Sequence, residues 1–581
     1  MIERNVNNIN EGNKKRRFAV DDIKKFIDAD RVDDTVLVLH GLRRTGKTTM
    51  MNQIIEDYRD SVKCAFIEIE KKDTMDDIYL KLMQLRDEYV KIVCLDEITN
   101  AEDFIENSAV LADIFARDGM RIILAGTNSL SFNFAAKSAL FGRIEWIQTT
   151  HIPYAEHSYI LGTTDIDDYI EYGGLMERGK KKQEVLTELE MKRYLDSAVS
   201  DNIISSIKKD EEESLVENIP TKELKAIIAK MVEIYSGSFR TEKIQNELKS
   251  VNINAALNFL YKTEFKNIIK PVYDDKQNIT RDFAEIIEAN EEIKTKITED
   301  IIKDLKDYFI KMDLLSLTKK RIFTYIAEKG WLEEEEKFQS YIIQPAIKYY
   351  HLEKGLKFID DKKYFDNLSD DIKDLLKKKL NEKIKGDMIE QIVVFDVNRS
   401  LNPRIPGYIS KIRYDVFKPE FFINGAPVGE YDLLVRNKEN NTYYAFEIKH
   451  TINPSKQQYE TLQNNDITEF ANNHFGKRLG VAVLYRGDNF KTDEGIIYLN
   501  ISDFLIAVNK YKNMELAMDE LTKNLEVKSI DEMKKDKNID LYQQELEIAT
   551  QEQNTLFTEY DEGGAGTGSG SGFGGSRNRN R

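Results

Sequence analysis

A glycine-rich stretch between a short apolar run and a helix constrains the fold of this chain more than any other feature. Residues 41–48, GLRRTGKT, fit the pattern G-x4-G-K-[ST], whose backbone N–H groups form an anion-binding nest at a helix N-terminus. The β-branched, apolar run at 35–40 predicts a buried strand, and 48–58 predicts a helix. This order predicts a parallel α/β sheet that binds a nucleoside triphosphate with Mg²⁺.

Each position of the loop has a chemical role in that prediction. Gly41 and Gly46 permit backbone conformations that are closed to other residues. Lys47 is expected to neutralise the β and γ phosphates, and the hydroxyl of Thr48 is expected to ligate Mg²⁺, which prefers oxygen ligands. The alternative is a surface turn that matches by chance, and the flanking strand and helix argue against it.

Two further apolar runs end in polar residues that suit the same chemistry. The run at 91–97 ends in Asp96 and Glu97, which places both acids at the C-terminal edge of a parallel sheet, where such folds bind ligands. Asp96 is expected to hold the Mg²⁺ shell and Glu97 to orient the attacking water. The run at 121–126 leads to 127–129, which would lie beside the γ-phosphate if the three strands are neighbours. Solvated strand-end acids are the alternative.

The N-terminal region resembles the prokaryotic AAA-type ATPases of the archaeal-ATPase group, within the P-loop superfamily. The resemblance rests on segments 41–49, 95–98, 126–129, 141–143, 152–154 and 172–174. It implies that Thr127 or Asn128 senses the γ-phosphate. It also implies that Arg143 contacts phosphate in cis or from a neighbouring subunit, which makes a homo-oligomer a candidate; a salt-bridged Arg143 is the open alternative. The expected nucleotide-binding residues are Gly41, Arg44, Thr45, Gly46, Lys47, Thr48, Thr49 and Asn128.

Length and charge limit the number of domains and the kinds of partner that the chain can have. A chain of 581 residues predicts roughly three or four domains. The net charge of -17 argues against nucleic-acid binding by the whole surface, although the basic stretch at 14–17 keeps a local contact open. Cys64 and Cys94 lie in apolar runs and are expected to be reduced core residues of a cytoplasmic protein. No run of about eighteen apolar residues exists, so no membrane partner is expected.

The sequence beyond residue 165 turns to charged helical patterns. Residues 221–273 resemble the winged-helix domain that follows the ATPase core in the same family, where it either contacts DNA or packs as a lid. The fold class we expect is multidomain α/β. Its parts are a P-loop domain at 1–165, a helical and winged-helix lid at 166–350, a helical linker at 351–380, an endonuclease-like core at 381–510, an acidic helical arm at 511–557 and a flexible Gly/Ser tail at 558–581.

A second group of chemically suited residues lies near the C-terminus. The runs at 431–435 and 443–449 predict a hairpin that brings Asp432, Glu447 and Lys449 to one face. Two carboxylates at this spacing can hold Mg²⁺ and lower the pKa of a bound water, while an adjacent ammonium stabilises charge on phosphate. An acid followed by E-x-K arises by chance in a chain this rich in Glu and Lys, so the strand context carries the prediction.

The hairpin and its flanks resemble the PD-(D/E)xK restriction-endonuclease-like core. The segment 386–394 resembles the leading helix of that family, which implies Glu390 as a further metal ligand. Gln457 is expected to begin the next helix, and 479–485 the next strand. Tyr431 replaces the proline that names the motif, a departure that puts cleavage in doubt. The sequence thus predicts ATP binding and hydrolysis, with nucleotide state controlling a nuclease-like domain that acts on DNA. The alternative is an ATP-gated switch whose C-terminal domain only binds a partner.

Overall fold

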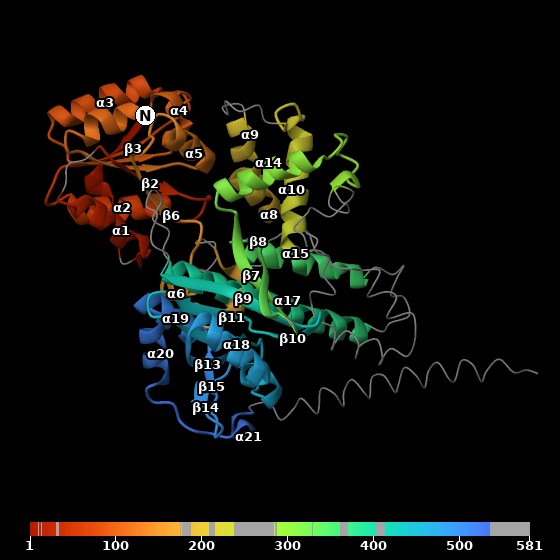
Figure 1. Ribbon diagram of the computed structural model, residues 1–581. Coiled ribbons are helices and arrows are strands. Elements are labelled where there is room, and N and C mark those ends of the chain that lie inside the picture. Colours follow the sequence, from red (N-terminus) through yellow and green to blue (C-terminus); the bar gives the residue numbers. More distant parts are fainter. Residues whose placement is uncertain are drawn as a thin grey trace, which may run out of the picture.

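The architecture comes from a computed structural model of the chain. It describes residues 1–9, 11–12, 14–30, 34–174, 176, 188–207, 215–237, 284, 287–327, 329–360, 370–402 and 413–534. Within these residues the chain forms two sheets, a group of helices beside the first sheet and a long helix between the two halves (Figure 1). None of the described helices is both long and apolar enough to cross a membrane.

The first sheet carries the glycine loop. Its strand order is β1-β3-β4-β5-β2-β6, and β1 alone runs antiparallel to its neighbour. The expected strands are present as β2 (Val36–His40), β4 (Ile92–Asp96) and β5 (Arg121–Ala125). The remaining strands are β1 (Ile2–Arg4), β3 (Cys64–Glu68) and β6 (Ile144–Gln148). Because β4, β5 and β2 are adjacent and parallel, their polar C-terminal ends meet at one edge.

Strand alternation divides the side chains of this sheet between two helical layers. Leu37 and Leu39 pack with α1 (Ala19–Asp28) and α2 (Lys47–Tyr58). Val36 and Val38 belong to the opposite core, which includes α3 (Met75–Asp87), η3 (Leu111–Ala116) and α5 (Ser129–Lys137). Every residue of β2 is therefore buried, as expected for a central strand covered on both faces.

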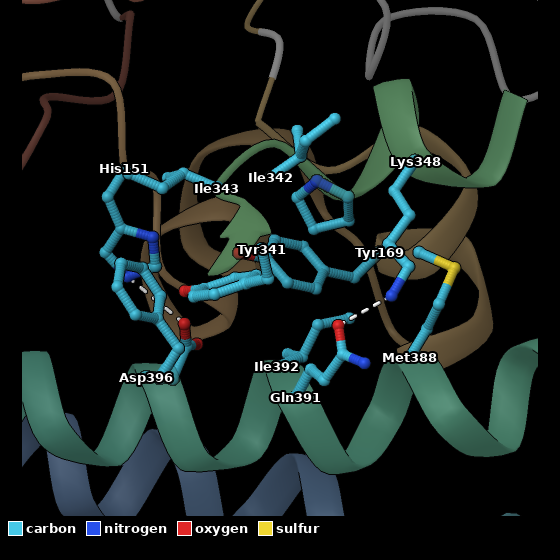
Figure 2. A pocket seen from close by; sticks show the side chains of 12 residues that line it. His151, Tyr169, Tyr341, Ile342, Ile343, Lys348, Met388, Gln391, Ile392 and Asp396 are labelled. Atoms are coloured by element: carbon cyan, nitrogen blue, oxygen red, sulfur yellow. Dashed lines mark hydrogen bonds and ion pairs between the residues drawn. The ribbon is translucent and has the colours of Figure 1, made fainter. Parts of the chain in front are cut away.

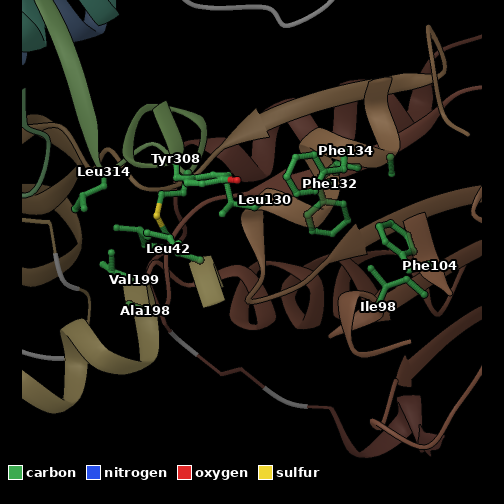
Figure 3. Packing of buried hydrophobic residues seen from close by; sticks show 14 of the residues in the cluster. Leu42, Ile98, Phe104, Leu130, Phe132, Phe134, Ala198, Val199, Tyr308 and Leu314 are labelled. Atoms are coloured by element: carbon green, nitrogen blue, oxygen red, sulfur yellow. The ribbon is translucent and has the colours of Figure 1, made fainter. Parts of the chain in front are cut away.

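A group of helices extends the second of these cores. It consists of α8 (Glu188–Leu195), η5 (Asp196–Ser200), α9 (Asp201–Ile207), α10 (Thr221–Ser236) and α14 (Glu299–Lys311). Figure 3 shows Leu42 of the glycine loop near Val199 of η5 and Leu314, with Leu130 of α5 beside Tyr308 of α14. The helices therefore share one apolar core with the loop end of the first sheet.

The second sheet contains the C-terminal hairpin. Its main strand order is β14-β15-β13-β12-β11-β9-β7-β8, and β10 also pairs with β9. The expected hairpin is β11 (Leu433–Asn437) with β12 (Thr442–Ile448), followed by β13 (Lys477–Tyr485) parallel to β12. Its other strands are β7 (Leu315–Ile326), β8 (Gly330–Ile342), β9 (Tyr414–Ile423), β10 (Ala426–Glu430), β14 (Phe490–Lys491) and β15 (Ile497–Asn500).

The long helix α17 (Asp370–Leu401) joins the two halves of the molecule (Figure 1). Its apolar residues form one core with the second sheet and with α19 (Ile501–Tyr511) and α20 (Met514–Thr522). The same core includes residues of α7 (Ile166–Tyr172) and α15 (Pro345–Gly355). The other face of the sheet is covered by α18 (Asn465–Phe475). The helix thus belongs to the C-terminal layer and touches elements that follow the first sheet.

Four expectations about organisation are changed or left open. Helical structure throughout 166–350 is wrong, because Leu315–Ile342 forms the hairpin β7–β8, whose strand β7 pairs in parallel with β9. The expected boundary at 380/381 falls inside α17. Residues 456–459 form only a 3₁₀ turn, and the following α-helix begins at Asn465. Most of the winged-helix prediction, residues 535–557 of the acidic arm and the whole tail lie outside the described residues.

Candidate functional site

The glycine loop ends where α2 begins. Lys47 is the first residue of that helix, and its side chain turns back to the loop. Gly46 is the residue before the helix and has φ 87°, a left-handed conformation that favours glycine. The buried Lys47 ammonium donates to the carbonyl oxygens of Gly41 (2.8 Å) and Leu42 (2.7 Å). Burial lowers the pKa of Lys47 to about 8, against the opposing effect of Glu97 and Asp96. Among the described residues, the hydrogen bonds of this ammonium go to carbonyl oxygens, so the loop holds a cation that suits an anionic ligand.

The acid predicted to complete a cation site is in contact with the loop. The Thr48 hydroxyl donates to Asp96 Oδ2 at 2.7 Å, and the Glu97 N–H donates to Asp96 Oδ1 at 3.0 Å. Burial raises the pKa of Asp96, although these bonds oppose the rise. A hydroxyl and a carboxylate that meet at the end of a phosphate loop fit Mg²⁺, which takes a few protein oxygens and completes its shell with phosphates and water.

Glu97 lies next to the end of β5. Its backbone is left-handed, with φ 56°. Its Oε2 accepts from Thr127 N at 3.1 Å and from Thr127 Oγ1 at 3.0 Å. Burial raises the pKa of Glu97, and the charge of Asp96 raises it further. Glu97 is therefore a positioned carboxylate beside the loop, as a group that accepts a proton from water requires.

The loop is fastened to the end of β6 by two threonines. Leu42 N donates to Thr150 Oγ1 at 3.0 Å, and the hydroxyls of Thr45 and Thr149 are 2.8 Å apart. Gly41 has φ 149°, and a Cβ at this position would lie 2.4 Å from Thr149 Oγ1. Thr45 is consequently a buried structural residue of the loop, and only glycine fits at position 41.

Arg17 is a residue of this site that the sequence did not single out. It belongs to the basic stretch at 14–17, yet its side chain is buried and the residue is only 5% exposed. Its guanidinium forms a bidentate pair with Glu156 (2.7 and 3.0 Å) and donates to the carbonyls of Thr45 and Thr149. It therefore holds the loop, the end of β6 and α6 (Tyr154–Leu161) together. The sequence pattern does not predict this role, because the partners of Arg17 are distant from it in sequence.

Replacing Arg17 by leucine is expected to destabilise the N-terminal domain by about 3 kcal/mol. The reason is that Glu156, which is 3% exposed, would keep a buried charge without its partner. Arg16→Leu is the matched control, because Arg16 pairs with Asp57 at the surface and such pairs contribute only about 0–1 kcal/mol. Native-state hydrogen exchange of the β2 and β6 amides measures the change in stability that each substitution causes. Equal effects of the two substitutions would contradict the assigned role of Arg17.

Asn128 does not contact the loop in this arrangement. Its Oδ1 accepts from the N–H groups of Leu130 and Ser131 at the start of α5 and from Ser206 Oγ. Its Nδ2 donates to Ser205 Oγ. Both polar atoms serve α5 and α9 here, and the expected contact of Asn128 with phosphate stays a prediction. Thr127, the other residue named for that role, lies beside Glu97, and its hydroxyl is 3.4 Å from Arg43 Nη2.

Arg143 lies at the opposite end of the sheet from the loop. It precedes β6, which pairs in parallel with β2 from Val36↔Ile144 to His40↔Gln148. That length of strand places it more than ~13 Å from the loop end of β2. Its guanidinium is 2.9 Å from Asp113 and 3.8 Å from Asp34. A contact with phosphate in cis is therefore wrong, and the salt-bridged alternative describes this residue; contact from a neighbouring subunit stays a prediction.

The other two residues assigned to the nucleotide sit at the rim of the loop. Arg44 is exposed, has φ 64° and lies with its guanidinium carbon 5.7 Å from the ring centroid of Tyr194 in α8. Thr49 is half-buried in the first turn of α2. Arg44 thus connects the loop to α8, and the role of Thr49 toward the nucleotide stays a prediction.

The C-terminal candidates are brought together at the open end of the hairpin β11–β12, away from its turn. Asp432 directly precedes β11, Glu447 is in β12, and Lys449 directly follows that strand. The Lys449 ammonium is 2.9 Å from Asp432 Oδ2 and 2.7 Å from Glu447 Oε2. Asp432 also accepts from Ile448 N at 2.8 Å. The expected shared face of residues 447 and 449 is confirmed.

A second lysine, which the sequence did not indicate, joins this group. Lys418 of β9 is 3.0 Å from Glu390 Oε2, 3.3 Å from Glu430 Oε1 and 3.4 Å from Asp432 Oδ1. Burial would raise the pKa of Asp432, but Lys449 and Lys418 hold it at about 2. Burial and the charge of Asp432 raise the pKa of Glu390 to about 7. We call Glu390, Lys418, Glu430, Asp432, Glu447 and Lys449 the C-terminal charged cluster.

The expected Mg²⁺ ligands Glu390, Asp432 and Glu447 do not form a ready cation site. Ammonium groups lie between them, so the carboxylate oxygens are engaged within the chain. In the described part of the chain, no three His, Cys, Asp or Glu side chains are arranged to hold a metal ion. The C-terminal residues thus share the expected position, but this arrangement does not fit the cation.

Comparisons with known proteins agree with the N-terminal geometry. Residues 33–157 match the profile of a family described as an AAA domain, which confirms the expected AAA-type P-loop domain and does not reach the second sheet. Among solved structures, the chain is similar to the Hsp104–ADP complex of S. cerevisiae at 13% identity and a TM-score of 0.23. That similarity covers 64% of this chain and only 44% of the Hsp104 chain, and it carries no argument. No curated protein matches the chain.

Proposed function

We propose that the protein binds ATP with Mg²⁺ at the loop edge of the first sheet and hydrolyses it. The contact between Thr48 Oγ1 and Asp96 Oδ2, 2.7 Å, is the observation that carries this proposal. It sets two oxygen ligands beside the Lys47 ammonium and the first turn of α2, where anions bind. When bound, Mg²⁺ would neutralise charge on the phosphates.

In this proposal each residue around the loop has a separate chemical role. Lys47 exchanges its two carbonyl partners for phosphate oxygens and places positive charge where negative charge develops. Glu97 orients water and accepts its proton, and the bonds from Thr127 fix the direction of the carboxylate. Asp96 and Thr48 hold the cation in place. Lysine and glutamate in these separate roles favour hydrolysis over binding alone.

We further propose that nucleotide state controls the C-terminal domain through the residues that follow β6. His151, two residues after Thr149, has its Nε2 3.1 Å from Asp396 Oδ1 of α17, as Figure 2 shows. Asp396 also accepts from Tyr154 N at 2.8 Å. Asp396 and Glu390 are on the same helix, about 9 Å apart along its axis. The helix α17 therefore contacts the segment that follows these threonines and also carries Glu390 of the C-terminal charged cluster.

A second contact reaches the same cluster from α7. Asp167 Oδ1 is 2.7 Å from His450 Nε2, and His450 follows Lys449. Lys385 of α17 and Arg486 also pair with Asp167, at 3.3 and 3.2 Å. Burial would raise the pKa of Asp167, but His450 and these cations hold it at about 2. Movement of α7 or α17 would thus act on Lys449 or Glu390, which supports control of the cluster by the N-terminal half.

The proposed target of this control is DNA. The support is the meeting of Asp432, Glu447 and Lys449 at one sheet edge, with a helix that carries Glu390 against the same sheet. The resemblance to the PD-(D/E)xK core rests on these residues. The competing proposal is a switch whose C-terminal domain binds a partner without chemistry, and the two lysines that engage the carboxylates favour it.

Incubation with plasmid DNA separates the two proposals. With Mg²⁺ or Mn²⁺, we expect cutting that depends on ATP and is lost in Asp432→Ala and Lys449→Ala, because both residues belong to the C-terminal charged cluster. Both variants should keep ATP hydrolysis, since neither contacts the glycine loop. Lys379→Ala serves as a control for loss of a charge on α17, because Lys379 pairs with the exposed Glu382 and belongs neither to the cluster nor to the contacts around Asp167. Agarose gel analysis that shows no cutting under any condition would favour the switch.

A further inference from the structure

Lys418 occupies a point at which three carboxylates converge. Glu390 comes from α17, Glu430 from β10 and Asp432 from the turn before β11, yet all three have an oxygen within 3.4 Å of the same ammonium. Oxygens gathered from separate elements around one centre are the arrangement that a bound cation requires. Here the centre holds a positive charge that belongs to the chain itself.

The charge balance of the cluster explains why that ammonium is held. The cluster contains four carboxylates, and Asp432 and Glu447 are only 3% and 8% exposed in their side chains. Buried carboxylates are costly unless they are paired. Lys449 pairs with Asp432 and Glu447, which leaves Glu390 and Glu430 to Lys418. Without Lys418, Glu390 and Glu430 would face Asp432 with no ammonium at the point where the three converge, and Lys449 would pair only with the other oxygen of Asp432.

Backbone pairing sets the position of Lys418. Phe417 and Leu434 are paired across β9 and β11, so position 418 lies close to the start of β11, where Asp432 is found. Phe417 and Phe421 face the apolar core with α18. Strand alternation turns Lys418 to the face on which α17 carries Glu390. The lysine is thus held in place by strand register and is not a surface side chain that reaches in by chance.

We infer that the Lys418 ammonium fills the cation position of the C-terminal charged cluster, so that a divalent metal ion enters only when this side chain leaves. The inference deepens the proposed control of the C-terminal domain, because it names the group whose displacement would open the cluster. A lysine that only stabilises the fold is the alternative. In that case its removal would weaken the fold and create no metal site.

Titration of the nucleotide-free full-length protein with Mn²⁺ tests the inference. Lys418→Met keeps the length of the side chain and removes its charge, and should bind one additional Mn²⁺ at least about tenfold more tightly than the unmodified protein. Lys320→Met is the matched control, because Lys320 is paired with Lys418 across β7 and β9 and has its own partner, Glu420. The amount of free Mn²⁺, followed by electron paramagnetic resonance, gives the affinity.

A double variant locates the new site. Adding Asp432→Asn to Lys418→Met should remove the gain, because Asp432 contributes one of the converging oxygens. A folded Lys418→Met protein with no gain in affinity would overturn the inference. If Lys418→Met and Lys418→Gln both fail to fold, the unmodified protein decides: a tight Mn²⁺ site that Asp432→Asn removes overturns the inference, and its absence supports it. Neither ATP nor DNA is present, so failure here leaves the proposed function untouched.

Discussion

Lys47→Ala is expected to lower kcat/KM for ATP by at least about a hundredfold. The substitution removes a buried ammonium that lies within 2.8 Å of two carbonyl oxygens of the glycine loop and forms no hydrogen bond to a carboxylate in the part of the chain that the structure describes. In the ATP complex the same group would face the phosphates, where a charge in a water-poor site has a large effect. Binding of ATP should weaken together with hydrolysis, because the ammonium contacts the ligand in both states.

Phosphate release and the change in fluorescence of a labelled ATP analogue measure the two effects. Lys63→Ala is a suitable control, because Lys63 precedes β3 and donates to the carbonyl of Glu88, away from the loop. Circular dichroism checks that the loop variant folds, since Lys47 also bonds the loop itself. Unchanged binding and hydrolysis in a folded Lys47→Ala protein would refute the assignment of the nucleotide site.

Glu97→Gln should separate binding from hydrolysis. Glutamine has nearly the same shape and can still accept the bonds from Thr127, so we expect ATP affinity to be retained. It cannot take a proton from water, and the turnover number should fall roughly 10²- to 10⁴-fold, the usual contribution of a general base. A protein that holds ATP without hydrolysing it would also provide the state needed to examine control of the C-terminal domain.

A carboxylate on the neighbouring strand provides the comparison. Glu68 is paired in register with Asp96 across β3 and β4, and its carboxylate contacts Arg4 at 2.7 Å. Glu68→Gln should leave turnover nearly unchanged. Single-turnover kinetics with bound ATP measure the chemical step in both variants. A Glu97→Gln protein that hydrolyses ATP at the normal rate would move the proton-accepting role to another group.

Local patterns were enough to predict the strands around the glycine loop and the contact at its edge. The apolar runs that became β2, β4 and β5 are short, β-branched and covered on both faces, so they leave little choice of structure. Parallel strands present their C-terminal ends at the same edge, which is why Asp96 could be assigned to the loop without knowing any contact. The contact of Thr48 with Asp96 agrees with that reasoning.

Other features depend on pairings that no local pattern records. Arg17 looked like a solvated residue in a basic stretch, yet its partner Glu156 is far along the chain. Lys418 is an unremarkable lysine until the register of β9 with β11 brings it to Asp432. Arg143 was assigned by resemblance, but its place at the start of β6 decides what it can reach. The positions of these three residues depend on contacts between segments that are distant in sequence, and the periodicity of the sequence does not record such contacts.

The hairpin β7–β8 shows why the middle of the chain was misread. Its sequence carries Lys319, Lys320 and Arg321 on one strand and consecutive glutamates on the other, a composition that suggested charged helices. In the fold these charges pair across the strands, for example Lys319 with Glu336 at 2.9 Å. Cross-strand ion pairs stabilise a hairpin that faces solvent, and they cannot be predicted until the register of β7 with β8 is known.

The parallel pairing of β7 with β9 has a consequence for how the protein is made. Tyr414, where β9 begins, follows Ile326, the end of β7, by roughly 90 residues. At the usual speed of a ribosome, the hairpin must wait on the order of 5–20 s before its neighbour is synthesised. During that interval the edge of β7 that later pairs with β9 is open. We therefore expect newly made chains to be most prone to aggregation, or to chaperone binding, at this stage.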